Sequence, residues 1–513
     1  IIYFIFLEFL FIVRYLRYLF NFFKIVSFFK YLIYRKKDYR ILRNTTQKRA
    51  LEKNYSFWKK SIKKKDGQDN ILITSLVSVE SYCIGEATIG KSLSKILNKN
   101  SVALIKEHDF KAEILINSYD VDKIYYLPNG NFLSRFKFLF KSIELIKDLK
   151  TTDDLISLKY ENIDIGIAAY DHYIRFTGKG SENLINYKMV NFLSKSLLIQ
   201  DFLNHLFKLN YFKEVIQAET QFIPAQIVFQ NALINKCKVF SRIGLDNKIS
   251  VMIFDDFKNR YKDRYCYSKD LVNSTYNNYN NNISNKIEHL MTERFKGNAA
   301  YSSMHNVEEN MTHKNKNIDN LDYNYNKNSL CEKLNWDINK PIVVLFASDL
   351  TDGVFKYNWK IFKDNLTGIR ETINIIKEIK DINWLIKPHP SDIKLKIITT
   401  TEKEVLNLSS EYEHLKLFPK NFGNGPLPKI ISAAVSMSGS AGFEYPALGV
   451  PSIISTGTIY TGYGFTYEGN TINEFKKILK NADKLTPLSI EQITKAKTFI
   501  YIHEFLTKVS SSL

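Results

Sequence analysis

The sequence has few cysteines and no pair of them with metal-ligand spacing. Cys83, Cys237, Cys266 and Cys331 stand far apart, and no CxxC occurs. Zinc sites and disulfide frameworks both need closely patterned cysteines, so neither is indicated. The cysteine pattern fits a protein of the reducing cytoplasm, and the sequence predicts no metal site.

A dinucleotide-binding fingerprint is also missing. The first strand-like run, Ile71 to Val77, is not followed by GxGxxG, the motif that brings a backbone close to a pyrophosphate. No nucleic-acid-binding motif accompanies the basic residues either. We therefore expect no bound cofactor and no nucleic-acid partner.

The N-terminus lacks the roughly 20 uncharged apolar residues that a spanning helix needs. It begins IIYFIFLEFLFIV, but Arg14, Arg17 and Lys24 interrupt the apolar run that follows. These cations and Asn21 share one sector of a helical wheel. Residues 1–65 hold 17 Lys/Arg and three acidic residues, so most of the net charge of +19 lies there. The pattern predicts a basic amphipathic helix, within residues 1–66, that lies on an anionic membrane surface.

Other interpretations of this segment stay open. A helix packed on a partner protein or on another domain would show the same pattern. The segment is not typical of a cleavable signal, because its charges follow the apolar run. The chain starts at Ile, so a longer apolar segment upstream, and with it a true span, also stays possible.

The body of the chain alternates strand-like and helix-like segments, which predicts parallel sheets and an α/β fold. At 513 residues the chain exceeds one core. We expect a first Rossmann-like domain over 67–267, an Asn-rich flexible insert or linker over 268–336 with a helical island at Lys286 to Phe295, a second Rossmann-like domain over 337–490 and a C-terminal helix over 491–513. The strands expected in the first domain are Ile71 to Val77, Val102 to Ile105, Lys123 to Leu127, Ile163 to Ala169, Val215 to Ala218 and Lys238 to Ile243.

Two polar turns in the second domain carry the chemistry. NWLIKPHPS, Asn383 to Ser391, is a strand that ends in a Lys and a His stiffened by prolines. SMSGSAGFEYPALGVP, Ser436 to Pro451, is a strand that enters a Gly-Ser turn and a helix. Lys387 and His389 can donate to phosphate, and Ser438, Gly439 and Ser440 lie where a helix N-terminus attracts anions. Glu444, one turn after Ser440, can accept from ribose hydroxyls.

These turns also permit structural interpretations. His389 could cap a turn, and the Gly-Ser turn could cap a helix that holds Glu444 in a surface pair. Their occurrence together in one Rossmann-like half favours a nucleotide pocket.

In order and spacing, the region from about 341 to 505 resembles the bacterial capsule polysaccharide biosynthesis family, which includes Kdo transferases. The matching motifs are Lys-Pro-His-Pro-Ser, then Gly-Ser-x-x-x-Glu with Gly449 and Pro451, and a preceding loop with Asp352, Tyr357 and Trp359. The resemblance implies two Rossmann-like domains facing a cleft (the GT-B architecture). It also implies that Asp352 and Trp359 belong to a loop near the donor or acceptor.

An inverting transfer needs a general base near the acceptor hydroxyl. In this architecture the base usually comes from the end of a strand in the first domain. Asp171, after IDIGIAAY, is the leading candidate, with His172 beside it and Glu86 as its rival. Asp171 could equally cap a helix or form an ion pair with Arg175. The family more often carries a His near Glu219, and this chain has none there.

The resemblance implies a metal-independent glycosyltransferase of surface polysaccharide biosynthesis. Its expected donor is a nucleotide sugar, CMP-activated Kdo or a sialic-acid-like sugar, and its expected acceptor is a lipid-linked glycan or polysaccharide. A UDP- or GDP-sugar transferase, a CDP-polyol phosphotransferase and a UDP-sugar 2-epimerase are the alternatives. We expect a peripheral position on the cytoplasmic face of the bacterial inner membrane, with other capsule assembly proteins as further partners.

Overall fold

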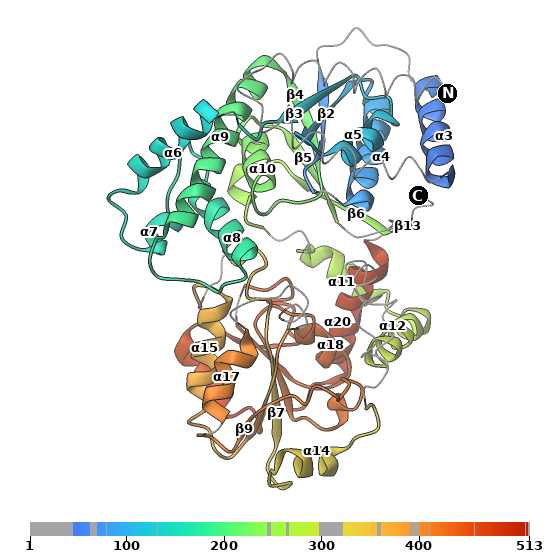
Figure 1. Ribbon diagram of the computed structural model, residues 1–513. Coiled ribbons are helices and arrows are strands. Elements are labelled where there is room, and N and C mark those ends of the chain that lie inside the picture. Colours follow the sequence, from blue (N-terminus) through green and yellow to red (C-terminus); the bar gives the residue numbers. More distant parts are fainter. Residues whose placement is uncertain are drawn as a thin grey trace. The chain divides into compact units, whose positions relative to one another are not determined.

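The chain forms two α/β units, each built around its own sheet (Figure 1). A computed structural model describes residues 45–61, 69–77, 79–130, 132–243, 248–262, 266–296, 322–355, 361–389, 392, 400–409, 411–455, 457–507 and 509–510. The described residues of the first unit fall within Ile1–Tyr173, Asn183–Arg260 and Ser510–Leu513, and those of the second within Ile174–Glu182 and Tyr261–Val509. The α/β class and the two Rossmann-like units expected from the sequence are confirmed.

The first unit is organised around a sheet with the strand order β13-β6-β5-β4-β1-β2-β3. Strands β1 to β5 pair in parallel, and β6 runs antiparallel to β5. Its strands are β1 (Asn70–Ser75), β2 (Asn100–Lys106), β3 (Lys123–Leu127), β4 (Phe212–Gln217), β5 (Lys238–Ile243) and β6 (Lys248–Phe254), with β13 (Val509–Ser510) at the edge. Its helices are α3 (Thr45–Ser61), α4 (Glu80–Leu97), α5 (Phe110–Asn117), α6 (Phe132–Ile146), α7 (Thr152–Ile156), α8 (Ile165–Thr177, whose last residues fall in the second unit), α9 (Tyr187–Leu209), α10 (Ala225–Ile234) and the short η3 (Phe257–Asn259).

The second unit is organised around a parallel sheet with the strand order β12-β11-β10-β7-β8-β9. Its strands are β7 (Ile342–Phe346), β8 (Asn383–Lys387), β9 (Leu415–Leu417), β10 (Ala433–Ser436), β11 (Ser452–Ser455) and β12 (Tyr467–Gly469). Its helices are α11 (Lys269–Asn277), α12 (Asn281–Phe295), α14 (Lys327–Leu334), α15 (Asn365–Ile376), α17 (Thr401–Ser409), η6 (Leu427–Lys429), α18 (Ala441–Ala447), α19 (Ile472–Lys480), α20 (Ile490–Tyr501) and η7 (Ile502–Leu506).

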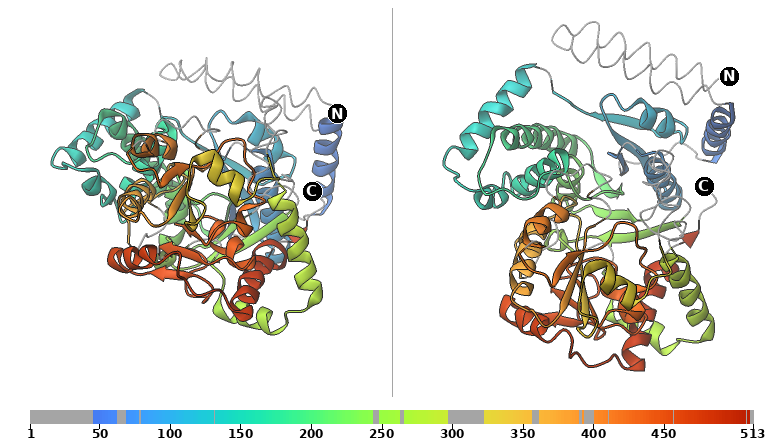
Figure 2. Two further views of the ribbon diagram at one scale, coloured as in Figure 1. Left: turned by 90° about the horizontal axis from the view of Figure 1, so that it is seen from below. Right: turned by 60° about the horizontal axis from the view of Figure 1, so that its bottom comes forward.

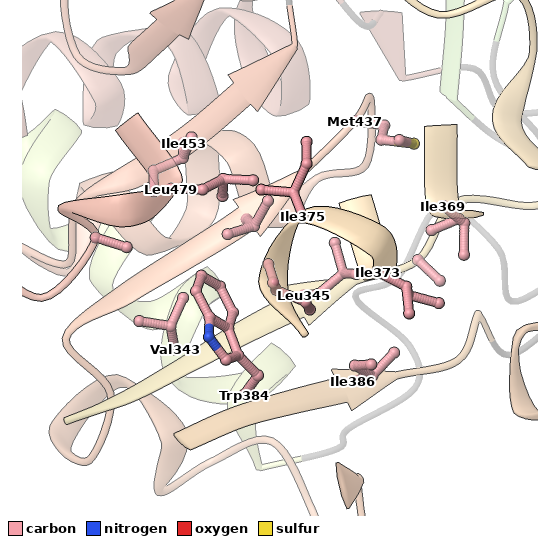
Figure 3. Close-up of a cluster of buried hydrophobic side chains, with 14 of the residues drawn as sticks. Val343, Leu345, Ile369, Ile373, Ile375, Trp384, Ile386, Met437, Ile453 and Leu479 are labelled. Carbon is pink, nitrogen blue, oxygen red and sulfur yellow. The ribbon is translucent and has the colours of Figure 1, made fainter. Parts of the chain in front are cut away.

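The core of the second unit shows why its strands read as unbroken apolar runs. Val343 and Leu345 of β7 pack on one face of the sheet with Trp384 and residues of α15 (Figure 3). Ile342 and Val344 pack on the other face against α14 and α18. A parallel strand covered on both faces needs apolar side chains at every position, and the sequence run IVVLF supplies them.

The expected strand at Ile163 to Ala169 is wrong. Helix α8 begins at Ile165 and contains the rest of that run. A short apolar run of this kind does not distinguish a strand from a buried helix. Gly166 permits the helical packing, because a Cβ there would lie 1.7 Å from the Leu155 carbonyl oxygen at the end of α7.

The range 268–336 is not a flexible insert in its described parts. Helix α12 buries Ile283, Ile287, Leu290 and Met291 against α20, and α14 packs beneath the sheet. The four buried residues of α12 are spaced by four, three and one positions, which places them on one apolar face of a helix within Asn-rich sequence. The helical island expected at Lys286 to Phe295 is confirmed as the C-terminal part of α12, which begins earlier, at Asn281.

The N-terminal prediction falls mostly outside the described residues, because these begin at Thr45. Helix α3 belongs to the first unit, where Leu51 and Trp58 join the core and Asn54 Nδ2 donates to Ser118 Oγ (2.9 Å). Part of α3, at the end of the range predicted for the membrane region, therefore packs into the first unit. Within the part of the chain that the structure describes, no helix has the length and apolar character to cross a bilayer.

Candidate functional site

The topology of the second sheet gathers the predicted donor residues at one edge. From β7 the chain proceeds to β8 and β9 on one side, and later returns to β10 and β11 on the other. The carboxyl ends of β7 and β10 therefore form a topological switch point, where open α/β sheets bind ligands. The Ser348 and Ser438 hydroxyls lie 3.4 Å apart across it.

An acidic side chain follows β7 at this point. Asp349 accepts from the Thr351 backbone N–H (2.8 Å) and hydroxyl (3.0 Å) through Oδ1. Its Oδ2 lies 3.7 Å from Nη1 of Arg175, which belongs to the same unit. Asp349 is thus fixed by its own turn and carries a negative charge to the edge of the sheet.

Lys387 is the last residue of β8 and His389 follows the strand, as the sequence predicts. Burial lowers the pKa of Lys387 to about 8, and its Nζ lies 4.4 Å from the centroid of the Phe418 ring. Burial also lowers the pKa of His389. The negative charge of Asp349 opposes this decrease, and the positive charge of Lys387 adds to it. A weakly solvated ammonium beside an imidazole can bind a phosphate strongly, because little water has to be displaced.

The Gly-Ser turn after β10 exposes two serines, and the backbone of Gly439 makes hydrogen bonds within the unit. Ser438 and Ser440 are exposed. The Gly439 N–H donates to Ser436 Oγ (3.0 Å), and its carbonyl accepts from the Tyr460 hydroxyl (2.9 Å). Gly439 therefore stabilises the turn, and its N–H is directed at Ser436 in this structure. Both serine side chains are exposed, and the Ser440 hydroxyl also makes a hydrogen bond to Glu444.

Glu444 lies in the first turn of α18, one turn after Ser440 and on the same side, as its spacing predicts. It is largely buried, and burial raises its pKa, while Arg294 and a hydrogen bond from the Ser440 side chain oppose the rise. Arg294 Nη1 lies 2.8 Å from Glu444 Oε1, and its Nη2 lies 2.6 Å from Glu504 Oε1. The guanidinium holds the Glu444 carboxylate charged and oriented.

The loop expected near the donor or acceptor is described only in part. Asp352 is exposed in the turn after β7, beside Gly353, which has φ of +60°. Tyr357 and Trp359 lie outside the described residues. Asp349, which the sequence analysis did not single out, follows β7 closely, and its charge acts on His389.

The first unit also has a pocket at the carboxyl ends of its central strands. Strands β1 and β4 form its switch point, since β2 and β3 extend to one side and β5 to the other. A cavity of about 340 Å³ opens there, lined by Leu76, Val77, Val79, Lys106, Glu219, Gln221, Phe222, Ile223, Pro224 and Ala225. Glu219 Oε1 accepts from the N–H groups of Thr220 (2.7 Å) and Gln221 (2.9 Å), which fix its carboxylate at the wall.

The two sequence candidates for a general base are both buried near this pocket. Asp171 is 1% exposed and lies within helix α8, so its expected place at a strand end is wrong. Its neighbour His172 accepts from the Ile223 N–H through Nδ1 (3.2 Å), and its pKa is lowered to about 4 by burial and by Lys195 and Lys106.

Glu86 lies inside α4, not in a loop, and is 2% exposed. It accepts from the Ala218 N–H at the end of β4 (2.6 Å). Burial raises its pKa to about 8, with the nearby Arg242 opposing and Glu219 adding to the rise. A carboxyl group in this state is mostly protonated at neutral pH, which suits a hydrogen-bonding role better than that of a base.

Sequence reasoning missed three side chains that the structure brings to these sites. Asp349 could have been found from its position directly after a buried strand. Glu219 has the same signal, because it follows β4. Arg294 has no local signal, since it lies 150 residues from Glu444 in Asn-rich sequence.

Comparison with known proteins concerns the fold alone. No protein-family model matches this chain, and no curated protein sequence does. Among solved structures, KpsC of Thermosulfurimonas dismutans, a beta Kdo 2,4 transferase, is similar at 12% identity and a TM-score of 0.33, over 58% of this chain and 85% of that one. The beta Kdo 2,7 transferase of KpsC from the same organism is similar at 11% sequence identity and a TM-score of 0.31. The match covers 57% of this chain and 79% of that one. The UDP-GlcNAc 2-epimerase of Neisseria meningitidis is similar at 12% sequence identity and a TM-score of 0.26. The match covers 85% of this chain and 99% of that one.

Proposed function

We propose that this chain is a glycosyltransferase of capsular polysaccharide biosynthesis that uses a nucleotide-sugar donor. The observation that carries the proposal is the set of phosphate-binding groups at the switch point of the second sheet. Lys387 and His389 follow β8, the Ser438 and Ser440 hydroxyls follow β10, and both turns end at the same edge. An anionic leaving group needs charge-compensating donors of this kind.

The donor we favour is a CMP-activated 3-deoxy acid sugar, Kdo or a sialic-acid-like sugar. Support comes from the order of the KPHPS and SGSAGFE motifs in the sequence, which resembles that of capsule Kdo transferases. The printed names of two structural neighbours agree with this choice.

In the proposed reaction the bond between the sugar carbon and the phosphate oxygen breaks, and the nucleotide leaves with the negative charge. Lys387 and His389 stabilise the charge that develops on the phosphate, because charge-assisted hydrogen bonds strengthen as it grows. Glu444, held by Arg294, accepts from the ribose hydroxyls. The reaction is inverting, so an acceptor oxygen attacks from the opposite face of the sugar.

The acceptor binds in the pocket of the first unit, and Glu219 is the general base. Glu219 has a carboxylate at the cavity wall, whereas Asp171 and Glu86 are buried behind it. A base must come within hydrogen-bond distance of the hydroxyl it deprotonates.

The acceptor is a lipid-linked or growing polysaccharide, met at the cytoplasmic face of the inner membrane by a peripherally bound enzyme that works beside other capsule assembly proteins. The cations of residues 1–65 support this location.

The test is nucleotide release from CMP-, UDP-, GDP- and CDP-activated donors, with and without a lipid-linked acceptor. We expect CMP release that depends on the acceptor. Release from a UDP, GDP or CDP donor instead would assign one of the alternative transferases. Interconversion of a UDP-sugar with its 2-epimer without acceptor would show the epimerase. No turnover and no thermal shift with any donor would refute the proposal.

Two variants locate the donor site. His389→Ala should weaken nucleotide binding by about tenfold or more, because it removes one charge-assisted hydrogen bond. His289→Ala, at an exposed position of α12 in the same unit, is the matched control and should bind as the wild type does. Equal affinities in both variants would contradict the assignment of His389.

A further inference from the structure

Helix α6 of the first unit exposes a stripe of large apolar side chains. Leu133 is 61% exposed, Phe136 44%, Phe140 65% and Ile143 47%. Their spacing of three, four and three residues places them along one side of the helix. Two exposed phenylalanines among four such residues form a contiguous patch, which on a soluble protein marks an interaction surface.

The opposite face of the same helix explains why the stripe is left outside. Phe138 is 7% exposed and Ser142 is fully buried, and this inner face packs against α9. Figure 1 and the right-hand view of Figure 2 both place α6 at the periphery of its unit, away from the sheet. The inner face supplies the packing that a helix needs, so the outer apolar stripe has no role in the core of the unit.

Basic residues surround the stripe. Residues 132–150 carry five Lys or Arg and two acidic residues. Glu144 pairs with Lys141 (3.1 Å), and Asp201 lies 3.9 Å from Lys137. Lys147 is exposed on the side of the stripe. The surface is therefore apolar with a cationic border.

A cavity at the seam between α6 and α9 adjoins the stripe. It measures about 420 Å³ and is lined by Pro128, Asn129, Arg135, Phe136, Leu139, Asn191, Ser194, Lys195 and Leu198. Phe136 belongs both to the stripe and to this lining. Arg135 Nε donates to the Asn129 carbonyl (3.0 Å), which orients the guanidinium.

Two cations lie in the cavity lining near each other. Lys195 is exposed, and Arg135 lies close enough for the two positive charges to oppose each other. Among the described residues, no ion pair or hydrogen bond of the Lys195 ammonium occurs. Like charges held together at an amphipathic cavity favour an anion with an apolar part.

We propose that α6 docks this protein on an anionic phospholipid surface, with the stripe in the interface and a headgroup phosphate held by Arg135 and Lys195. Apolar burial and electrostatic attraction to anionic lipid act together in interfacial helices. A second copy of this chain fits the surface less well, because a symmetric contact would bring the basic border of each α6 against the other.

The surface lies within the first unit, and lipid binding needs no sugar donor. Vesicle binding measured without donor therefore tests this inference separately from the transferase activity. Failure of one leaves the other standing.

The test uses the full chain and vesicles of phosphatidylcholine with or without phosphatidylglycerol. Phe136→Ser/Phe140→Ser should lower partition onto the anionic vesicles by roughly tenfold or more, because two phenyl rings no longer leave water. Ile96→Ser, which removes an apolar residue that is 75% exposed on α4, is the matched control and should bind as the wild type does. Unchanged melting of all variants verifies folding.

Arg135→Gln/Lys195→Gln should weaken the preference for phosphatidylglycerol, with the cations of residues 1–65 still in place, while retaining weak binding to phosphatidylcholine. Excess glycerol 3-phosphate should leave the wild type on the vesicles, whereas release by it would indicate a soluble phosphate ligand and overturn the lipid assignment. An environment-sensitive dye on Ile143→Cys should shift to shorter wavelength on anionic vesicles; the labelled wild type corrects for Cys266.

Three results would overturn the proposal. One is wild-type partition of Phe136→Ser/Phe140→Ser, which would assign membrane binding to another segment such as residues 1–44. Another is a dye on Ile143→Cys that stays in water while the protein is bound. The third is a dimer in solution that the same double variant abolishes, which would assign the stripe to a second copy of the chain.

Discussion

Arg294 is the residue whose removal tests the architecture of the donor site most directly. Its guanidinium, with a side chain 10% exposed, bridges Glu444 and Glu504 at 2.8 and 2.6 Å. Arg294→Gln removes the shared cation and leaves two buried carboxylates beside each other. Breaking a buried ion pair by removing one partner costs about 3–5 kcal/mol. For a unit of this size, that corresponds to a decrease in melting temperature of roughly 6–20 °C.

The pH dependence of this loss has a definite sign. The pKa of Glu444 is raised by burial and lowered by Arg294, so it should rise further in Arg294→Gln. A carboxyl whose folded-state pKa lies above its unfolded value binds more protons when folded, so stability falls as pH rises from the unfolded pKa through the folded one. The variant should therefore lose more stability at about pH 8 than at about pH 5.

The assay is denaturant unfolding at both pH values, followed by the fluorescence of Trp384, which is buried in the core of this unit. Lys497→Gln is the control, because it breaks a pair with Glu288, which is 58% exposed, and should cost less than about 1 kcal/mol. Adding Glu504→Gln to Arg294→Gln should restore part of the lost stability. A loss below about 1 kcal/mol for Arg294→Gln at both pH values would refute the reasoning.

Other predictions concern the two pockets. Nucleotide affinity should fall as pH rises through about 8, the pKa of Lys387, and Lys387→Arg should move that fall to higher pH; a pH-independent affinity in the wild type would contradict the role of Lys387. Glu219→Gln should lower turnover by about 10²–10⁴-fold with donor affinity intact, whereas Glu86→Gln should retain most turnover at neutral pH; the reverse result would make Glu86 the base. Gly442→Ala should lower the melting temperature, because its Cβ would lie 2.1 Å from the Tyr460 hydroxyl oxygen; unchanged stability would show that Tyr460 moves freely.

The sequence by itself determined the fold class and most strands. All but one of the strands expected in the first domain are present, and the two strands expected to lead into the polar turns of the second domain are present as β8 and β10. Parallel strands are covered on both faces, so each forms a continuous apolar run that can be recognised from the sequence of that segment alone. Lys387, His389, Ser438 and Ser440 were found for the same reason, since a polar turn directly after such a run marks the ligand edge of a sheet.

Tertiary structure alone decided the rest. Asp171 lies on a helix because Gly166 lets α8 pack on α7, a contact that a seven-residue apolar run does not predict. Arg294 reaches Glu444 across 150 residues, and the apolar stripe of α6 is left outside because α9 covers the other face. Contacts of this kind depend on which surfaces pack together, and periodicity within one segment carries no information about its partner.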